Sequence, residues 1–176
     1  SSDETVKCAQ GVDLPNLSII SGSPLAEGWS GKLWALEQGR QKVSSEYILL
    51  LDADIELEAG TIAALLEKME SNDLDMVSLM AFLRMQSFWE LLLMPAFIYF
   101  FKLLYPFALS NSGSRLVAAA AGGCILVKTK KLDEIGGFAT LKDALIDDCS
   151  LARHIKKSGG RIWTGLSHSA ISHRCY

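Results

Sequence analysis

The chain has 176 residues, of which 49% are hydrophobic, and its formal net charge at pH 7 is −3. This length and apolar content are enough for the core of one domain, so we expect a single domain over residues 1–176. The small negative charge excludes a field that would hold a polyanion nonspecifically, and no nucleic acid is expected as a partner.

The N-terminus and the cysteines bear on the cellular compartment. Residues 1–5 contain neither a basic region nor an apolar region, so they are not expected to be a signal peptide. The cysteines form no Cys-x-x-Cys pair and no zinc-site spacing with histidines, and we interpret them as reduced and cytosolic. They are Cys8, Cys124, Cys149 and Cys175.

Strand and helix patterns alternate along the first half of the chain. A short buried strand is predicted at Leu17 to Ile20, a helix from Lys32 to Arg40, and a second strand over 46–51. The second strand is apolar on both faces, as a central strand of a helix-covered parallel sheet should be. It runs directly into Asp52-Ala53-Asp54.

The second half continues this alternation. After Glu58, apolar residues recur at helical spacing and predict a surface helix that packs on the sheet. Further strands are predicted at 75–80, 123–128 and 161–164, and a helix over 143–158 ends at Gly159-Gly160. Together these elements predict an α/β fold.

The segment Phe88 to Leu109 is almost entirely apolar and rich in aromatic residues. Its charge-free part, Leu91 to Phe101, is shorter than the about 20 residues of a spanning helix, so it should not cross a bilayer. Two interpretations stay open: a buried core helix, or a helix in the lipid headgroup region, where Trp89, Tyr99 and Tyr105 would fit. Apolar residues on all sides of the helix favour the membrane surface, with reversible association through Trp89, Phe97, Phe100 and Phe101.

Asp52 and Asp54 stand one residue apart at the carboxyl end of a predicted buried strand, where open α/β sheets bind their ligands. At ~4 Å and an effective dielectric of about 20, the two charges would repel by on the order of 4 kcal/mol, a cost that a divalent cation reverses. Oxygen ligands suit Mg²⁺ or Mn²⁺, and Mg²⁺ is usually bound by one or two carboxylates together with substrate phosphates. The pair therefore indicates a phosphorylated substrate.

A second acidic pair, Asp147 and Asp148, lies near the start of a predicted helix. The helix dipole favours acids there, so a purely structural role stays open for Asp147. With the first pair present, Asp148 becomes a candidate general base. His168 and His173 are weighed as metal ligands, although isolated strand histidines are more often structural.

Four motifs in a fixed order carry a family resemblance. They are Gly28-Trp29-Ser30-Gly31-Lys32, Leu-Leu-Leu-Asp52-Ala53-Asp54, Ala121-Gly122-Gly123-Cys124 with Gly136-Gly137-Phe138, and Asp147-Asp148-Cys149-Ser150-Leu151. The chain resembles a family 2 glycosyltransferase of GT-A fold, with likeness to the ceramide glucosyltransferase-like and hopanoid-associated branches that act on lipids. The resemblance implies a mixed, mostly parallel sheet flanked by helices, which here would lack the first strand and nucleotide loop at the N-terminal side.

The resemblance also implies roles for particular residues. Asp52 and Asp54 would hold a Mg²⁺ or Mn²⁺ that bridges the diphosphate of a UDP-sugar. Asp148, with Asp147 beside it, would supply the base for a single inverting transfer. The implied donor-binding residues are Trp29, Lys32, Asp52, Asp54, Gly122 and Gly123.

A lipid acceptor, hopanoid-like or sphingolipid-like, and a location at the cytoplasmic face of the membrane complete this hypothesis. The lack of a Gln-x-x-Arg-Trp motif after residues 172–174 makes processive synthesis doubtful. Two alternatives stay open. A haloacid-dehalogenase-like phosphatase also has two such acidic pairs, but its pattern expects Thr or Val where Ile55 stands. The other alternative is a catalytically silent lipid-surface module on a degenerate transferase fold.

Overall fold

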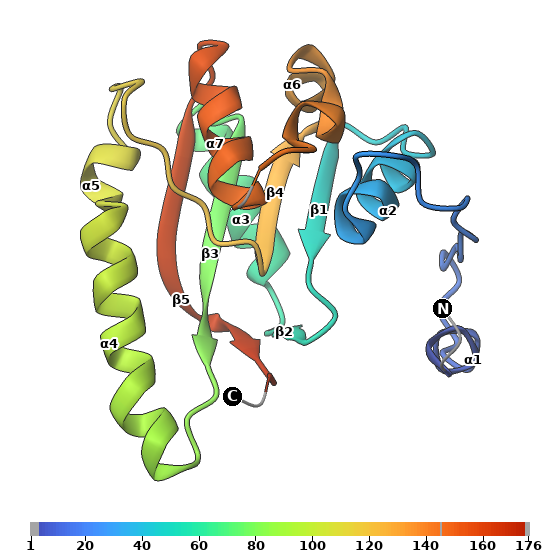
Figure 1. Ribbon diagram of the computed structural model, residues 1–176, viewed down its shortest axis with the longest axis horizontal. Helices are drawn as coiled ribbons and strands as arrows, with labels where there is room; N and C mark the ends of the chain where they lie inside the picture. Colours follow the sequence, from blue (N-terminus) through green and yellow to red (C-terminus); the bar gives the residue numbers. More distant parts are fainter. Residues whose placement is uncertain (1–3, 145, 175–176) are drawn as a thin grey trace.

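The computed structural model describes residues 4–144 and 146–174. Its centre is a five-stranded sheet of order β1-β4-β3-β5-β2 (Figure 1). The strands are β1 (Tyr47–Leu51), β2 (Ile55–Leu57), β3 (Met76–Leu83), β4 (Cys124–Lys128) and β5 (Ile162–Ser172). The strands predicted at 46–51, 75–80, 123–128 and 161–164 are thus confirmed, and the last one is much longer than predicted.

The sheet is mixed, but the prediction that it is mostly parallel is wrong. β4 lies antiparallel between β1 and β3, β2 is antiparallel to β5, and only β3 and β5 form a parallel pair. The cause is the extended segment 112–123, which crosses back along the sheet before β4 begins (Figure 1). As a result, β4 starts at the edge where β1 and β3 end.

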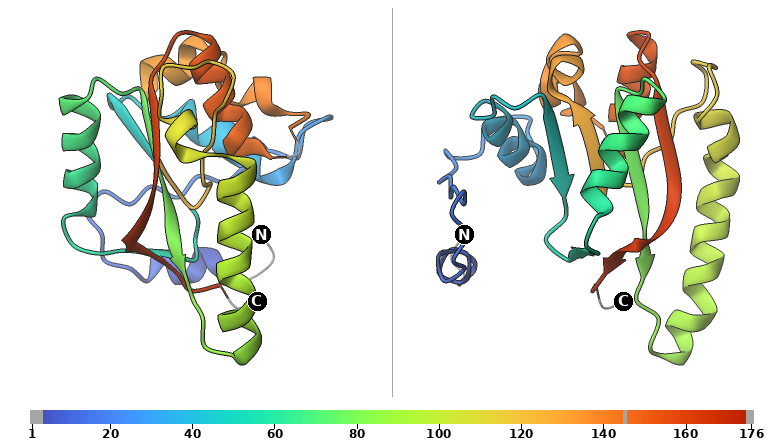
Figure 2. Two further views of the ribbon diagram at one scale, coloured as in Figure 1. Left: turned by 90° about the vertical axis from the view of Figure 1, so that its left-hand side faces the viewer. Right: turned by 180° about the vertical axis from the view of Figure 1, so that it is seen from behind.

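Helices cover both faces of the sheet. They are α1 (Thr5–Gln10), α2 (Gly31–Arg40), α3 (Thr61–Ser71), α4 (Phe88–Leu104), α5 (Phe107–Ser110), α6 (Thr129–Glu134), the 3-10 helix η1 (Gly137–Leu141) and α7 (Asp147–Lys157). Figure 2 shows α3 on one face and α2, α4 and α7 on the other. The helices predicted over 32–40, after Glu58 and over 143–158 are confirmed, although α7 begins only at Asp147.

The strand predicted at Leu17 to Ile20 is wrong. This segment has neither helix nor strand structure, and its residues are exposed. A short apolar run becomes a strand only where it finds a partner, and within the described part of the chain no strand lies beside it. For the same reason β1 is an edge strand of this sheet rather than a central one.

The two faces of the central strands pack into separate cores, because successive side chains of a strand point to opposite sides. Met76 of β3 and Ile125 of β4 belong to the core under α2, η1 and α7. Their neighbours Val77 and Leu126 belong to the core under α3. The fold is therefore a three-layer α/β/α arrangement with helices on both sides of one sheet.

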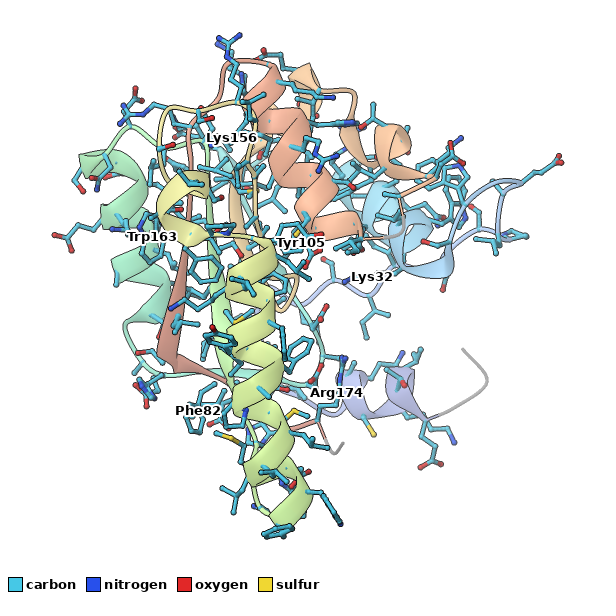
Figure 3. All side chains as sticks on the ribbon, turned by 60° about the vertical axis from the view of Figure 1, so that its left-hand side comes forward. Lys32, Phe82, Tyr105, Lys156, Trp163 and Arg174 are labelled. Carbon is cyan, nitrogen blue, oxygen red and sulfur yellow. The ribbon has the colours of Figure 1, made fainter. Side chains whose placement is uncertain are left out.

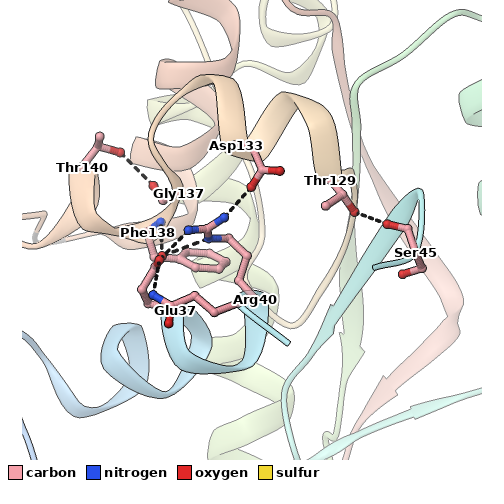
Figure 4. Close-up of polar contacts among 9 residues, drawn as sticks. Glu37, Arg40, Ser45, Thr129, Asp133, Gly137, Phe138 and Thr140 are labelled. Carbon is pink, nitrogen blue, oxygen red and sulfur yellow. Dashed lines mark hydrogen bonds and ion pairs between the residues drawn. The ribbon is translucent and has the colours of Figure 1, made fainter. Parts of the chain in front are cut away.

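A buried ionic network ties α2 to η1 (Figure 4). The buried Glu37 carboxylate accepts hydrogen bonds from the Arg40 guanidinium at 2.6 and 3.1 Å and from the N–H of Phe138 at 3.0 Å. Arg40 also contacts Asp133. Burial raises the pKa of Glu37, but these donors outweigh it and lower the pKa overall. The ionised carboxylate thus holds η1 beside α2.

Gly137→Ala is expected to lower the free energy of unfolding by about 2 kcal/mol or more. Gly137 has φ +66°, and an added Cβ would lie 2.7 Å from Arg40 Nε and 2.8 Å from Glu37 Oε2. Gly39→Ala is the matched control, because Gly39 lies in α2 with nothing within 4 Å of an added Cβ. Chemical denaturation should show this control unchanged or stabilised by up to ~1 kcal/mol. Equal midpoints for the two variants would contradict the prediction.

Lys156 is a buried cation that organises the loop before β4. Only 3% of it is exposed. Its Nζ donates to the carbonyl oxygens of Ser110 at 2.7 Å, Ser112 at 3.1 Å and Val117 at 2.8 Å. Burial lowers the pKa of Lys156. These three bonds hold the segment that leads from α5 into residues 118–123.

Lys156→Met is expected to destabilise the fold by about 3 kcal/mol, because three carbonyl groups lose a charged donor at once. Lys157→Met removes the same charge at the exposed neighbouring position and should change stability by less than about 0.5 kcal/mol. Thermal unfolding of both variants checks the difference. A Lys156→Met protein as stable as the control would show that the loop does not depend on these bonds.

Candidate functional site

The predicted acidic residues converge at the edge of the sheet where β1 ends. The N–H of Asp52 donates to the carbonyl of Gly123 at 3.0 Å, and Leu51 pairs with Cys124 across the antiparallel β1–β4 ladder. The end of β1 therefore meets the beginning of β4. Asp147 and Asp148 occupy the first turn of α7. Lys32 of α2 lies between this turn and the end of β1.

Lys32 lies between the two acidic pairs. Its Nζ is 3.4 Å from Asp52 Oδ1 and 3.6 Å from Asp147 Oδ2. Burial alone would lower the pKa of Lys32, but the charges of Asp147 and Asp52 raise it overall. α2 is positioned by its N-cap Ser30, whose Oγ accepts from the N–H of Leu33. The Gly-Trp-Ser-Gly-Lys motif thus places the charged amino group of Lys32 beside the aspartates.

Asp54 is held from the opposite end of the chain. Ser172 Oγ donates to Asp54 Oδ2 at 2.8 Å, and Arg174 Nη2 lies 3.0 Å from Asp54 Oδ1. Burial raises the pKa of Asp54, but the two donors outweigh it, so the pKa is lowered and the carboxylate stays ionised. Sequence reasoning missed Ser172 and Arg174 because it ended the last strand at Thr164. A serine at the end of a long final strand with an arginine two residues later is the signal that would have identified them.

Asp148 is half-buried against Gly122. Its Oδ1 accepts from the N–H of Cys149 at 2.8 Å, and a Cβ added to Gly122 would lie 3.1 Å from Asp148 Oδ2. Burial raises the pKa of Asp148, and the charge of Asp147 adds to this effect. The N–H groups of Cys149 and Gly122 and the charge of Lys32 offset it only in part, so the pKa remains above its ordinary value. A carboxylate in this setting accepts a proton more readily than an exposed one.

Two adjoining cavities meet at Asp148, and both are lined by Asp52, Gly122 and Asp148. The α2 cavity adds Lys32 and Asp147 above an apolar floor. The α4 cavity has a larger lining, which adds Asp54, Ile55, Met80, Ala81, Leu83, Phe97, Phe101, Ala121, Gly123, Ser172 and Arg174. In Figure 3 Lys32 and Arg174 lie on the same side of α4, with Phe82 and Trp163 on the other side. The two acidic pairs therefore share one continuous site.

The charges of this site suit a divalent cation. Four carboxylates and two basic side chains line the two cavities, which leaves a formal charge of −2. Within residues 4–144 and 146–174, no group of three or more His, Cys, Asp or Glu side chains forms a ready-made metal site. Asp52 and Asp54 thus fit Mg²⁺ or Mn²⁺ only as a pair of ligands completed by substrate phosphates.

Three residues considered from the sequence lie outside both linings. Trp29 packs on Trp34 at 5.1 Å between ring centroids, and Lys142 Nζ lies 4.5 Å above its ring. His173 Nε2 is 2.7 Å from Glu56 Oε2. The His168 ring lies 5.1 Å from that of Phe82. Donor binding by Trp29 remains a prediction, and metal binding by either histidine remains an open alternative to a structural role.

Two cysteines lie near the site, and neither is a reactive thiol. Cys124 and Cys149 are free and buried, and burial raises the pKa of each to about 11. Cys8 is free and exposed. Cys175 lies outside the described residues. The sulfur of Cys149 lies 3.4 Å from the Ala120 carbonyl oxygen, so this side chain packs against the segment that leads into β4.

The apolar segment 88–109 forms α4 and most of α5. The interpretation of a buried core helix is wrong, because nearly all residues of α4 are exposed or only partly buried. Ser87 and Glu90 close a capping box at its start, and Glu90 is its only buried residue. The partly buried positions Met94, Ile98 and Phe101 continue from Glu90 at helical spacing, so α4 contacts the domain along one narrow stripe. No helix in the described ranges has the length and apolar character needed to cross a bilayer.

The chain matches a known protein family over most of its length. The family described as Glycosyl transferase family 21 matches residues 15–173. Among solved structures, the chain is similar to the mannosyltransferase PcManGT from Pyrobaculum calidifontis in complex with GDP-Man and Mn²⁺, with 21% identity and a TM-score of 0.59. That alignment covers 81% of this chain but only 36% of the mannosyltransferase. No curated protein matches the sequence. The likeness confirms an α/β glycosyltransferase-like fold.

Proposed function

Because the chain belongs to glycosyl transferase family 21, we propose that it transfers a sugar from a UDP-sugar to a lipid hydroxyl in one inverting step. The sequence motifs predicted a glycosyltransferase, which is confirmed, but they named family 2, and the family found is family 21. The observation that supports the proposed chemistry is that Asp54 and Asp148 open onto the same cavity. A general base and a diphosphate site must be neighbours for a single displacement.

In the proposed reaction, Asp148 accepts the proton of the acceptor hydroxyl while that oxygen forms a bond to the anomeric carbon. The bond between the anomeric carbon and the diphosphate oxygen breaks, and the diphosphate leaves with the electron pair. Asp52 and Asp54 would hold a Mg²⁺ or Mn²⁺, which stabilises the charge of the leaving diphosphate when bound. Lys32, whose Nζ lies between Asp52 and Asp147, adds a cation on the same side.

The raised pKa of Asp148 favours proton transfer from the acceptor hydroxyl. A base whose pKa lies nearer the working pH takes up a proton with a smaller energetic penalty. Gly122 keeps that carboxylate accessible, since a Cβ there would lie 3.1 Å from Asp148 Oδ2. We assign Gly122 to this role of leaving room at the reacting groups, whereas a Cβ at Gly123 would meet Ile55 Cδ1 at 3.2 Å. The donor-binding role that the family resemblance implies for Gly122 and Gly123 is part of the proposal.

We propose that α4 seats the protein reversibly on the cytoplasmic face of a membrane. Trp89 is 65% exposed, Phe100 is 59% exposed, and both belong to the helix that contacts the domain only along one stripe. Aromatic side chains on such a helix suit the headgroup region. Liposome flotation of the full-length protein should show binding that weakens in a Trp89→Ser, Phe100→Ser variant, and wild-type protein that stays at the bottom would refute this proposal.

The decisive experiment is a donor screen on the full-length protein with a lipid extract and Mn²⁺. Release of the nucleoside diphosphate should depend on the lipid and on one of several UDP-sugars. GDP-Man belongs in the panel, because it is the ligand of the similar mannosyltransferase. Preference for GDP-Man would overturn the UDP assignment but not glycosyl transfer.

The phosphatase alternative is disfavoured by family membership, and a catalytically silent module would release no nucleotide with any donor.

A further inference from the structure

The lining of the α4 cavity contains two chemically different sets of side chains. The polar set is Asp52, Asp54 and Asp148, with Ser172 and Arg174 paired to Asp54. The apolar set, here called the apolar wall, is Ile55, Met80, Ala81, Leu83, Phe97 and Phe101. A sugar or a phosphate would find hydrogen-bonding side chains only in the first set.

Aromatic rings of α4 form part of the apolar wall. Phe97 and Phe101 lie one helical turn apart with ring centroids 6.5 Å apart, and the Phe101 ring also lies 5.1 Å from that of Tyr105. Phe101 is partly buried and held by its neighbours, whereas Phe97 is 54% exposed. Rings at i, i+4 and i+8 form a column on one helix face. The cavity end of this column is Phe97 and Phe101, and the exposure of Phe97 leaves the wall open to solvent.

We propose that Phe97 and Phe101 bind the apolar body of an amphiphilic acceptor and thereby determine which alcohols are glycosylated. This inference rests on the proposed function, since it places the donor diphosphate at Lys32, Asp52 and Asp54 and leaves the apolar wall of the α4 cavity for the acceptor. Asp148 lines both cavities, so an acceptor hydroxyl at Asp148 faces the donor while its hydrocarbon part lies on the two rings. A water-soluble sugar acceptor would leave this wall in water and gain no free energy from covering it.

The first test is kinetic and uses the full-length enzyme in detergent micelles, with the best acceptor from the lipid extract. Phe97→Ala should raise the KM for the acceptor about tenfold. Phe97→Leu should bring this KM most of the way back to the wild-type value, and the KM for the donor should stay constant in both variants. Phe88→Ala is the matched control, because Phe88 is an exposed aromatic residue of the same helix and is not part of the cavity lining. An unchanged acceptor KM in Phe97→Ala would overturn the proposal.

The second test does not need turnover. A long-chain alcohol with a diazirine within its alkyl chain, photolysed with the full-length protein, should label peptides that contain residues 80–83 and 97–101. Excess hexadecanol should suppress this labelling, and labelling confined to the outer face of α4 would overturn the proposal. Calorimetry of UDP with Mn²⁺ separates the two hypotheses. Absent nucleotide binding contradicts the proposed function, whereas the labelling pattern reports on the apolar wall alone.

Discussion

Asp148→Asn is expected to reduce the transfer rate of the full-length enzyme by about 100- to 10,000-fold, the range over which a positioned general base contributes. Asparagine retains the shape of the side chain and an oxygen that can accept the N–H of Cys149, now 2.8 Å from Asp148 Oδ1. The substitution therefore removes the proton acceptor while keeping the hydrogen bond from the N–H of Cys149. The measurement is the initial rate of UDP release with saturating donor and acceptor.

The same variant should be at least as stable as the wild type. Burial raises the pKa of Asp148 in the folded state, so ionisation at neutral pH weakens folding. This contribution sets in as the pH rises from the unfolded pKa through the folded pKa, and asparagine eliminates it. Equal or higher Tm together with lost transfer would identify a catalytic role. A lower Tm would instead indicate that the carboxylate serves mainly the helix start.

The pH profile gives an independent check on Asp148. The base must be deprotonated, so activity should fall as the pH drops through its folded pKa, which lies above the about 3.9 of an ordinary aspartate. Asp143→Asn serves as control, since Asp143 is an exposed aspartate before the same helix and belongs to neither cavity lining. This control should retain both the wild-type transfer rate and the fall in activity at acidic pH. A profile without an acidic limb above that value would contradict the assignment of the base.

Asp54→Asn is expected to weaken Mn²⁺-dependent binding of UDP by at least about 100-fold, because a charged metal ligand becomes neutral. The asparagine can still accept the hydrogen bond of Ser172, now at 2.8 Å. It loses the attraction of Arg174, which lies 3.0 Å away. The substitution thus tests the negative charge with little change in packing. Calorimetry of UDP with Mn²⁺ and with EDTA measures the effect.

Asp73→Asn is the matched control for the metal experiment. Asp73 has φ 49°, a backbone conformation that asparagine also adopts, and it contacts Lys128 and Arg161 away from the acidic edge. Its UDP binding should equal that of the wild type. If Asp54→Asn bound UDP as tightly as this control in the presence of Mn²⁺, the metal would have to bind elsewhere. Binding that is the same with Mn²⁺ and with EDTA in the wild type would exclude a metal-assisted donor site.

Local sequence patterns were enough to predict most of the elements and the acidic motifs. Helical spacing and end signals identified α2, α3 and α7. In an amphipathic helix the apolar residues of the buried face recur every three to four positions, so a short stretch of sequence shows them. The run of leucines before Asp52 identified β1, and the placement of Asp147 and Asp148 at a helix start followed from the same local rules. The apolar composition of α4 was equally visible, but its exposure was not.

The tertiary structure decided everything that depends on residues far apart in the chain. The direction of β4 follows from the crossing segment 112–123, and the failure of residues 17–20 to form a strand follows from the lack of a pairing partner among the described residues. Arg174 reaches Asp54 across 120 positions. Sequence periodicity records the environment of neighbouring residues, whereas strand pairing, ion pairs and shared cavities are set by which distant segments meet. Only folding could therefore bring Asp54, Asp148 and the rings of α4 into one site.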